Sequence, residues 1–188
     1  MNHWIRRTTL LLCCFTSLIY AAPERQYDVQ VLVFSHLTPD TLQSETWPVV
    51  SPAIFNTNAT QTDSASELTH EKNALMKNPH YQILLDGSWP ETWRSGQSTV
   101  TIPLAGGSNA GAKLSGYMTI ALSHYFDVHT DLFLTEPTNL LKQIDPTLNI
   151  DQSSFSFHLL QNRRMRSNEL NYLDYPVIGV LIKIIPIK

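Results

Sequence analysis

Residues 27–36 read YDVQVLVFSH, and this stretch decides the kind of fold that the chain can adopt. Apolar side chains recur at every second position, which is the period of a β-strand. One set of alternate positions is apolar throughout and the other becomes apolar towards the end: Tyr27, Val29, Val31 and Val33 against Asp28, Gln30, Leu32 and Phe34. The stretch therefore predicts a strand that is covered increasingly on both sides.

Further apolar runs predict more strands, at residues 80–89, 97–104, 113–126, 127–137, 154–166, 168–173 and 176–187. The two long runs 113–126 and 127–137 are expected to meet in a tight turn near Asp127. The last three runs are expected to form a meander, and the final run is apolar enough for a central strand. This order predicts a single α+β domain, mainly antiparallel sheet with one or two helices packed on one face.

Two segments have helical signals. Ser64 and Glu67 have the S-x-x-E spacing of a capping box, and an apolar face then includes Leu68, Leu75 and Met76. This helix is expected to stop at residues 78–79. A second, shorter helical turn is expected over 138–145, before a proline.

Residues 38–63 are rich in Pro, Thr, Ser, Asn and Gln and have no hydrophobic period. A structureless stretch of that length within a compact domain is uncommon and is usually mobile or functional. The sequence predicts a mobile loop at about 38–63, with Trp47 as the side chain that anchors it to the core.

The first residues have the pattern of a secretory signal peptide: Arg6 and Arg7, then an apolar run, then small residues. We expect residues 1–21 to be removed and residues 22–188 to form the exported domain. Both cysteines, Cys13 and Cys14, lie in this leader, so the remaining chain has no thiol for a disulfide or a thiolate metal site. It also has no second long apolar run, and a transmembrane segment is therefore not expected after cleavage.

The net charge bears on possible partners. Without Arg6 and Arg7 the formal net charge falls from −3 to −5. A general nucleic-acid-binding protein needs a basic face, so nucleic acid is not expected as a partner.

No motif in the chain indicates an enzyme or a cofactor. The glycine-rich run 105–112 lacks the Lys-Ser/Thr pair of a phosphate-binding loop and is read as a hairpin turn. His124 and His129, with Asp127 and Asp131 close by, resemble a zinc-ligating set, but alternation places Asp127, His129 and Asp131 on one solvated strand face. None of the acidic residues lies in a pattern that requires the paired carboxylates of a wall hydrolase.

Trp89 and Trp93 occur in the run DGSWPETWRSG, beside expected turns. Tryptophan rings near turns can stack on sugar rings, because both surfaces are apolar. The alternative is that both rings pack in the core. Both interpretations remain open from the sequence.

Residues 161–176, QNRRMRSNELNYLDYP, concentrate arginine in an otherwise acidic chain. A two-residue hairpin turn at Ser167 and Asn168 would place Arg166 opposite Glu169 as a cross-strand ion pair. Arg164 would then face a neutral side chain, Asn171, and Arg163 would lie on the core side with Phe157, Leu159 and Met165. The bend is either a hairpin stabilised by cross-strand ion pairs or a site for an anionic ligand. The second alternative is possible because the planar guanidinium group matches carboxylates and phosphates. Tyr172 and Tyr175 add aromatic surface beside it.

The tail LLQNRRMRSNELNYLDYPVIGVLIKI resembles the C-terminal signature of the CsiV family, a run of the type RRMRSGELHYLDHP followed by an apolar strand. The segments YDVQVLVF, PHYQILLDGSW and LSGYMTIALSHYFDVHTDL agree in the same order. Asn168 stands where the family pattern has glycine, which indicates a turn with positive φ. His124 stands where arginine is expected, and Pro-Glu-Thr follows Trp89 where Arg-Gln is expected.

The resemblance implies a periplasmic protein that is not an enzyme, needs no metal or cofactor and binds peptidoglycan. It also implies support of cell-wall synthesis by a class A penicillin-binding protein and its outer-membrane lipoprotein activator. The site residues expected from the physical argument are Arg164 and Arg166, with Trp89, Trp93 and Tyr172 as further candidates. An adaptor that contacts proteins and never touches glycan is the alternative.

Overall fold

The computed structural model describes residues 24–51, 67–94 and 99–187. The expected signal peptide lies outside this range. The described elements are β1 (Arg25–His36), α1 (Pro39–Gln43), α2 (Thr69–Leu75), β2 (Tyr81–Trp93), β3 (Thr99–Gly107), β4 (Lys113–Leu122), β5 (Phe126–Pro137), α3 (Thr138–Ile144), β6 (Ser154–Met165), β7 (Asn171–Tyr175) and β8 (Ile178–Pro186).

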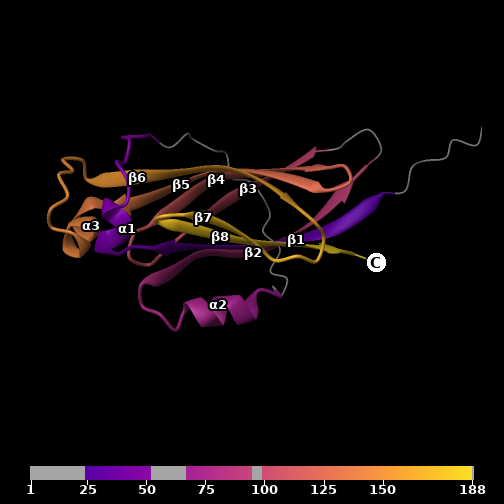
Figure 1. Ribbon diagram of the computed structural model, residues 1–188, viewed down its shortest axis with the longest axis horizontal. Coiled ribbons are helices and arrows are strands. Elements are labelled where there is room, and N and C mark those ends of the chain that lie inside the picture. The colour runs from indigo at the N-terminus through magenta and orange to yellow at the C-terminus, as the bar shows by residue number, and fades with distance from the viewer. Residues whose placement is uncertain (1–23, 52–66, 95–98, 188) are drawn as a thin grey trace, which may run out of the picture.

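The strands form two four-stranded antiparallel sheets (Figure 1). Sheet A has the order β2-β1-β8-β7, and sheet B has the order β3-β4-β5-β6. The predicted α+β class, with mainly antiparallel sheet, is confirmed. The difference from the expectation is that the strands divide between two sheets, because each sheet buries its apolar face against the other.

The core lies between the two sheets. Tyr27 of β1 contacts Phe126 of β5 edge to face, with 4.9 Å between ring centroids. Residues from the inner faces of both sheets belong to a single apolar cluster. β1 is buried on both sides, as its sequence predicts: Val31 and Leu32, which point to opposite faces, are both 0% exposed. Its neighbour β8 lies between β1 and β7, so the predicted central position of β8 is confirmed.

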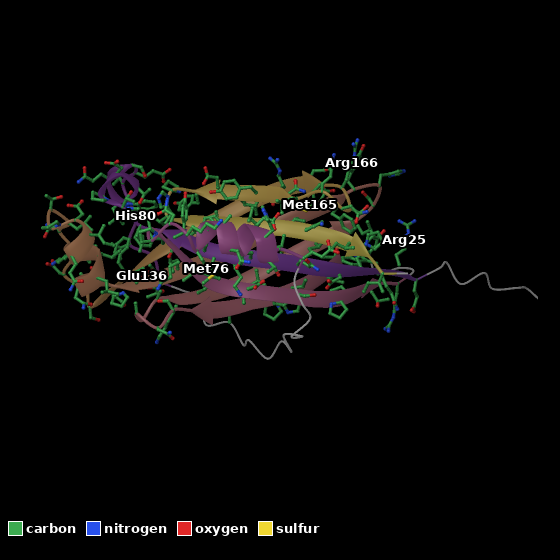
Figure 2. All side chains as sticks on the ribbon, turned by 90° about the horizontal axis from the view of Figure 1, so that it is seen from below. Arg25, Met76, His80, Glu136, Met165 and Arg166 are labelled. Atoms are coloured by element: carbon green, nitrogen blue, oxygen red, sulfur yellow. The ribbon has the colours of Figure 1, made fainter. Side chains whose placement is uncertain are left out.

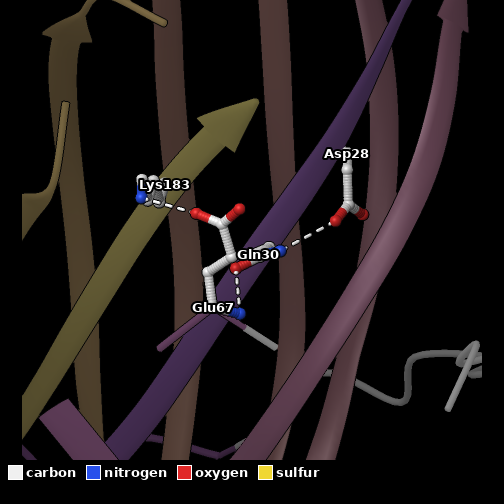
Figure 3. Close-up of polar contacts among 4 residues, drawn as sticks. All are labelled: Asp28, Gln30, Glu67 and Lys183. Carbon is white, nitrogen blue, oxygen red and sulfur yellow. Dashed lines mark hydrogen bonds and ion pairs between the residues drawn. The ribbon is translucent and has the colours of Figure 1, made fainter. Parts of the chain in front are cut away.

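The outer face of sheet A is covered by α2 and the residues before it. Gln30 is 2% exposed there, and both the nitrogen and the oxygen of its amide group are hydrogen-bonded (Figure 3). Its Nε2 donates to Asp28 Oδ2 at 2.8 Å, and its Oε1 accepts from the Glu67 backbone N–H at 2.8 Å. Glu67 also forms an ion pair with Lys183 of β8, at 2.7 Å. Gln30 of β1 and Lys183 of β8 are therefore attachment points of this cover.

Helix α2 differs from its prediction. It begins at Thr69 after Leu68, and no side chain caps it, so the S-x-x-E pattern at Glu67 does not start the described helix. Leu68 is buried as expected, at 1% exposed. Met76, which was expected on the apolar face, is 62% exposed at the C-cap of the helix.

Helices α1 and α3 lie together at one end of the molecule (Figure 1). Helix α3 confirms the predicted helical turn. Helix α1 lies in the stretch that was expected to be irregular, so that expectation is wrong for its first part; the stretch from residue 52 lies outside the described residues. Thr38 caps α1, and the predicted anchor, Trp47, donates its indole N–H to the Leu42 carbonyl at 2.6 Å. Among the described residues, no helix is long and apolar enough to cross a membrane.

Two turns fall where the sequence did not place them. The turn between β4 and β5 is made by residues 123–125, and Asp127 is already in β5. β6 and β7 belong to different sheets, so the first half of the predicted meander, with its two-residue hairpin, is wrong, whereas β7 and β8 pair as antiparallel neighbours as predicted. The segment 166–170 is instead a crossover between the sheets. Its Asn168 has φ 63°, the positive value that the sequence predicted, and its backbone N–H donates to Ile184 of β8 at 2.8 Å.

Asn168 provides a test of this crossover. Asn168→Gly should keep close to wild-type stability, because glycine adopts positive φ without steric cost. Asn168→Val should lower the free energy of unfolding by about 1–2 kcal/mol, because a β-branched residue is strained in the left-handed region. Denaturant unfolding of both variants measures the difference. Equal stability of the two variants would contradict the positive-φ crossover.

Glu136 places a carboxyl group at the α1–α3 end of the sandwich, far from the crossover (Figure 2). Glu136 of β5 is 2% exposed, and its Oε1 has no hydrogen-bond partner among the described residues. This burial raises the pKa of Glu136 to about 7. Glu136 therefore keeps its proton in the folded state at pH values where the unfolded chain has lost it.

Glu136 should make the protein less stable as the pH rises. The unfolded carboxyl ionises near its ordinary pKa of 4.5, whereas the folded one holds its proton until about 7. Stability therefore falls across this window, and the penalty is complete above pH 7. Glu136→Gln should remove it, so that the variant gains up to about 3 kcal/mol over wild type at about pH 8 and little at about pH 4. Denaturant unfolding at both pH values checks this, and a gain that does not depend on pH would contradict it.

Candidate functional site

The predicted arginine cluster lies at the end of β6, which is an edge strand of sheet B. The β5–β6 register places Arg164 beside Asp127 and Arg163 beside Val128. Arg166 follows at the start of the crossover, at the end of the molecule that lies opposite Glu136 (Figure 2). We call this region the arginine end; it consists of the three arginines with Tyr125 and Asp127.

Arg164 is held by a carboxylate. Its Nε donates to Asp127 Oδ1 at 2.7 Å and its Nη2 donates to Asp127 Oδ2 at 3.2 Å. This two-point contact raises the pKa of Arg164. The expected position opposite Asn171 is wrong, because Asn171 belongs to the other sheet. Arg164 is thus a cross-strand partner of β5, and its side chain remains 67% exposed.

Arg166 is held more loosely. Its Nη1 lies 4.0 Å from Glu169 Oε1, so the predicted pair exists, but it forms within the crossover and not across a hairpin. Its guanidinium carbon also lies 5.5 Å from the centre of the Tyr125 ring, and that of Arg164 lies 5.8 Å from the same ring. Both arginines therefore share one aromatic side chain. Tyr125 was missed from the sequence, although its place in the turn before β5 was the available signal.

Arg163 is exposed, although its neighbours on the same strand face, Leu159 and Met165, are buried. The reason is its place on an edge strand, where a long side chain can leave the rim of the sheet. Arg163 and Arg164 line an open groove of about 460 Å³. The other lining residues are Asp127, Val128, His129 and Asn162.

The two predicted tryptophans do not lie on a surface. Trp89 is 5% exposed and Trp93 is 4% exposed. Trp93 packs edge to face against Tyr27 and Phe126, with centroids 5.6 and 5.8 Å apart. Both rings belong to the apolar core, so a sugar ring has no access to them in this structure, and the core-packing alternative describes them.

Tyr172 is separated from the arginine end. It is 46% exposed on β7, and its ring stacks on Phe34 with 6.1 Å between centroids, so it lies on the outer face of sheet A. Its hydroxyl donates to Asp174 Oδ1 at 2.6 Å. Burial and this bond raise the pKa of Tyr172. The structure therefore brings together Arg164 and Arg166 but not Tyr172.

The acidic and histidine residues of β5 lie as the alternation predicts. Asp127, His129 and Asp131 are partly exposed on one face, whereas Val128 and Leu132 are buried on the other. Within the described ranges, no three His, Cys, Asp or Glu side chains are grouped closely enough to hold a metal ion.

The ion pair of Arg164 and Asp127 can be tested for a structural role. Arg164→Ala and Asp127→Ala should each lower stability slightly, and the double variant should be no less stable than either single variant, because both changes remove the same contact. High salt should reduce the effect, since both side chains are exposed. Thermal unfolding of the four proteins measures this. Additive losses would show that the pair does not act as a unit.

The comparisons with known proteins support the tail resemblance. The family model described as "Peptidoglycan-binding protein, CsiV" matches residues 56–187, which is most of the 188-residue chain and includes the arginine end. No curated protein and no solved structure gives a significant match. A peptidoglycan-binding family has its place in the periplasm or cell envelope, where its ligand is. The chain belongs to the CsiV family of peptidoglycan-binding proteins.

Proposed function

We propose that this protein is a periplasmic peptidoglycan-binding module without catalytic activity, and that its arginine end contacts the carboxylates of stem peptides. The observation that carries the proposal is the exposure of three arginine side chains at one end of a chain whose net charge is negative, two of which, Arg163 and Arg164, line the groove. An arginine offers five N–H donors in a planar fork, which matches a carboxylate.

The three arginines have different capacities for a ligand. Arg164 already uses two donor atoms on Asp127, so its main contribution is to fix the end of β6. Arg166 contacts Tyr125, and its one carboxylate contact is the 4.0 Å pair with Glu169, which an incoming carboxylate can replace. Arg163 lines the groove with its guanidinium exposed. Arg163 and Arg166 therefore make the ligand contacts in this proposal, and Arg164 and Tyr125 position them.

The proposed location rests on the leader at residues 1–21, whose pattern directs export. The family resemblance supports a role in cell-wall synthesis by a class A penicillin-binding protein and its outer-membrane lipoprotein activator. In that role the module binds peptidoglycan and keeps the penicillin-binding protein close to the polymer that it extends.

A protein-binding adaptor is the second candidate. One observation favours it: Leu170, in the crossover directly after Glu169, is 46% exposed. Exposed apolar side chains beside arginines are frequent in protein interfaces. The two functions predict different results with purified cell wall.

Co-sedimentation with isolated sacculi tests the proposal. The wild-type protein should pellet with sacculi and should bind less as salt rises from about 0.05 to about 1 M, because the contacts are between charges. Arg163→Gln with Arg166→Gln should weaken the apparent affinity about tenfold, which corresponds to the loss of about 1.4 kcal/mol. The thermal unfolding midpoint should stay close to that of wild type, since neither side chain is buried.

The matched control is Lys77→Gln with Lys142→Gln, which also removes two positive charges. Lys77 follows α2 and Lys142 lies in α3, and both are exposed. The control should bind sacculi as wild type does. Equal losses in both double variants would show that net charge alone matters, and would contradict a site at the arginine end. An absence of sacculus binding at every salt concentration would leave the adaptor as the better function.

A further inference from the structure

The two sheets differ in how much of their outer face the rest of the chain covers. α2 and Glu67 cover sheet A, whereas no described helix packs on the outer side of sheet B. The side chains of β4 and β5 on that side are mostly partly exposed, as at Tyr117, Thr119, His129 and Asp131. We call the outward-facing side chains of β3, β4, β5 and β6 the open face.

The centre of the open face is a network of fixed polar and aromatic groups. His158 Nε2 lies 2.7 Å from Asp131 Oδ1, and the Tyr117 hydroxyl bonds to the same carboxyl group, which raises the pKa of Tyr117. The His158 ring stacks on Phe133, with 4.2 Å between centroids and 5° between planes. Asp131 thus has two partners from two neighbouring strands, and the side chains are oriented before any ligand arrives.

The residues of the open face that lie nearer to the arginine end are also hydrogen-bonded to one another. His129 Nδ1 lies 2.7 Å from Asn162 Oδ1, and the His129 ring lies 6.4 Å from that of Tyr117. The hydroxyl groups of Thr101 and Thr119 are 3.2 Å apart. Short hydrogen-bonding side chains therefore surround the exposed aromatic and imidazole rings.

The open face carries little apolar surface. Of the large hydrophobic side chains that are exposed in the described part of the chain, only Leu160, at 56%, lies on it, opposite Asp131. A helix or an apolar protein surface would require a larger continuous patch. A ligand that presents small apolar faces between many hydroxyl and amide groups fits better.

We propose that the open face binds the glycan strand of peptidoglycan, with Tyr117 and Leu160 beneath the sugar rings and His129, Asn162 and the paired threonines at their hydroxyl and acetamido groups. This inference rests on the proposed function. The same face reaches Arg164 at the end of β6, in register with Asp127. A strand bound there brings its stem peptides to the arginine end, so that neutral and charged parts of one polymer meet separate parts of one surface.

The test uses two ligands that separate these parts. Intact sacculi carry both glycan and stem peptides, whereas oligomers of N-acetylglucosamine are neutral and carry no peptide. The wild-type protein should bind both, and its binding to the neutral oligomers should not change with salt, because no charge pairing is involved.

The decisive variant is Tyr117→Thr with Leu160→Thr, since threonine keeps a high strand propensity while it removes the ring and the isobutyl group. Its apparent Kd for the oligomers, measured by calorimetry, should rise by about tenfold or more. Met76→Thr is the control, because Met76 is 62% exposed on the opposite side of the molecule. The arginine double variant should bind the oligomers as wild type does and lose affinity only for sacculi. Circular dichroism checks that each variant is folded.

The outcomes distinguish the two proposals. Binding of intact sacculi without binding of the neutral oligomers would overturn the glycan site and leave the arginine site in place. Oligomer binding that the Tyr117–Leu160 variant retains in folded form would overturn the assignment to the open face. Failure to bind sacculi at any salt concentration would overturn the proposed function and this inference with it.

Discussion

The burial of two inner sheet faces against each other is the constraint on which the rest of this structure depends. Each sheet has four strands, and neither is stable alone with an apolar face in water. Contacts such as Tyr27 with Phe126 join the two faces into one core. Because both inner faces are used in this way, the ligand-binding capacity of the molecule is restricted to its outer faces, rims and ends.

The outer face of sheet A is covered and the outer face of sheet B is open, and particular side chains explain this difference. On sheet A, Gln30 and Lys183 bind the segment around Glu67, and this attaches α2 to the sheet. On sheet B, the corresponding polar groups bind one another, as His158 does with Asp131 and His129 with Asn162. Groups that satisfy one another do not need a covering helix, and they leave a surface that a polar ligand can approach.

The arginine end depends on where the chain changes sheets. The crossover at Asn168 is bonded to Ile184 of β8, which holds the end of β6 at the rim of the sandwich. At that rim Arg163 can leave the core face of its strand, and Arg164 reaches Asp127 across the sheet. The cluster therefore combines a cross-strand ion pair at Arg164 with exposed guanidinium groups at Arg163 and Arg166, and ligand binding at these groups stays a prediction.

The sequence by itself determined the strands, the burial of both faces of β1, the short helix α3, the positive φ of Asn168 and the family, because each depends on local periodicity, on a turn residue or on a motif. Only the tertiary structure decided which strands share a sheet. The same alternation fits a hairpin or a crossover, so Arg164 was placed opposite Asn171 when its partner is Asp127. It also decided that Trp89 and Trp93 are core residues, since an aromatic ring beside a turn packs inwards or outwards according to what lies above it. Burial and partner choice are sums over residues distant in sequence, and for that reason the strand pattern could be predicted from the chain, whereas the partner of Arg164 and the burial of Trp89 and Trp93 could not.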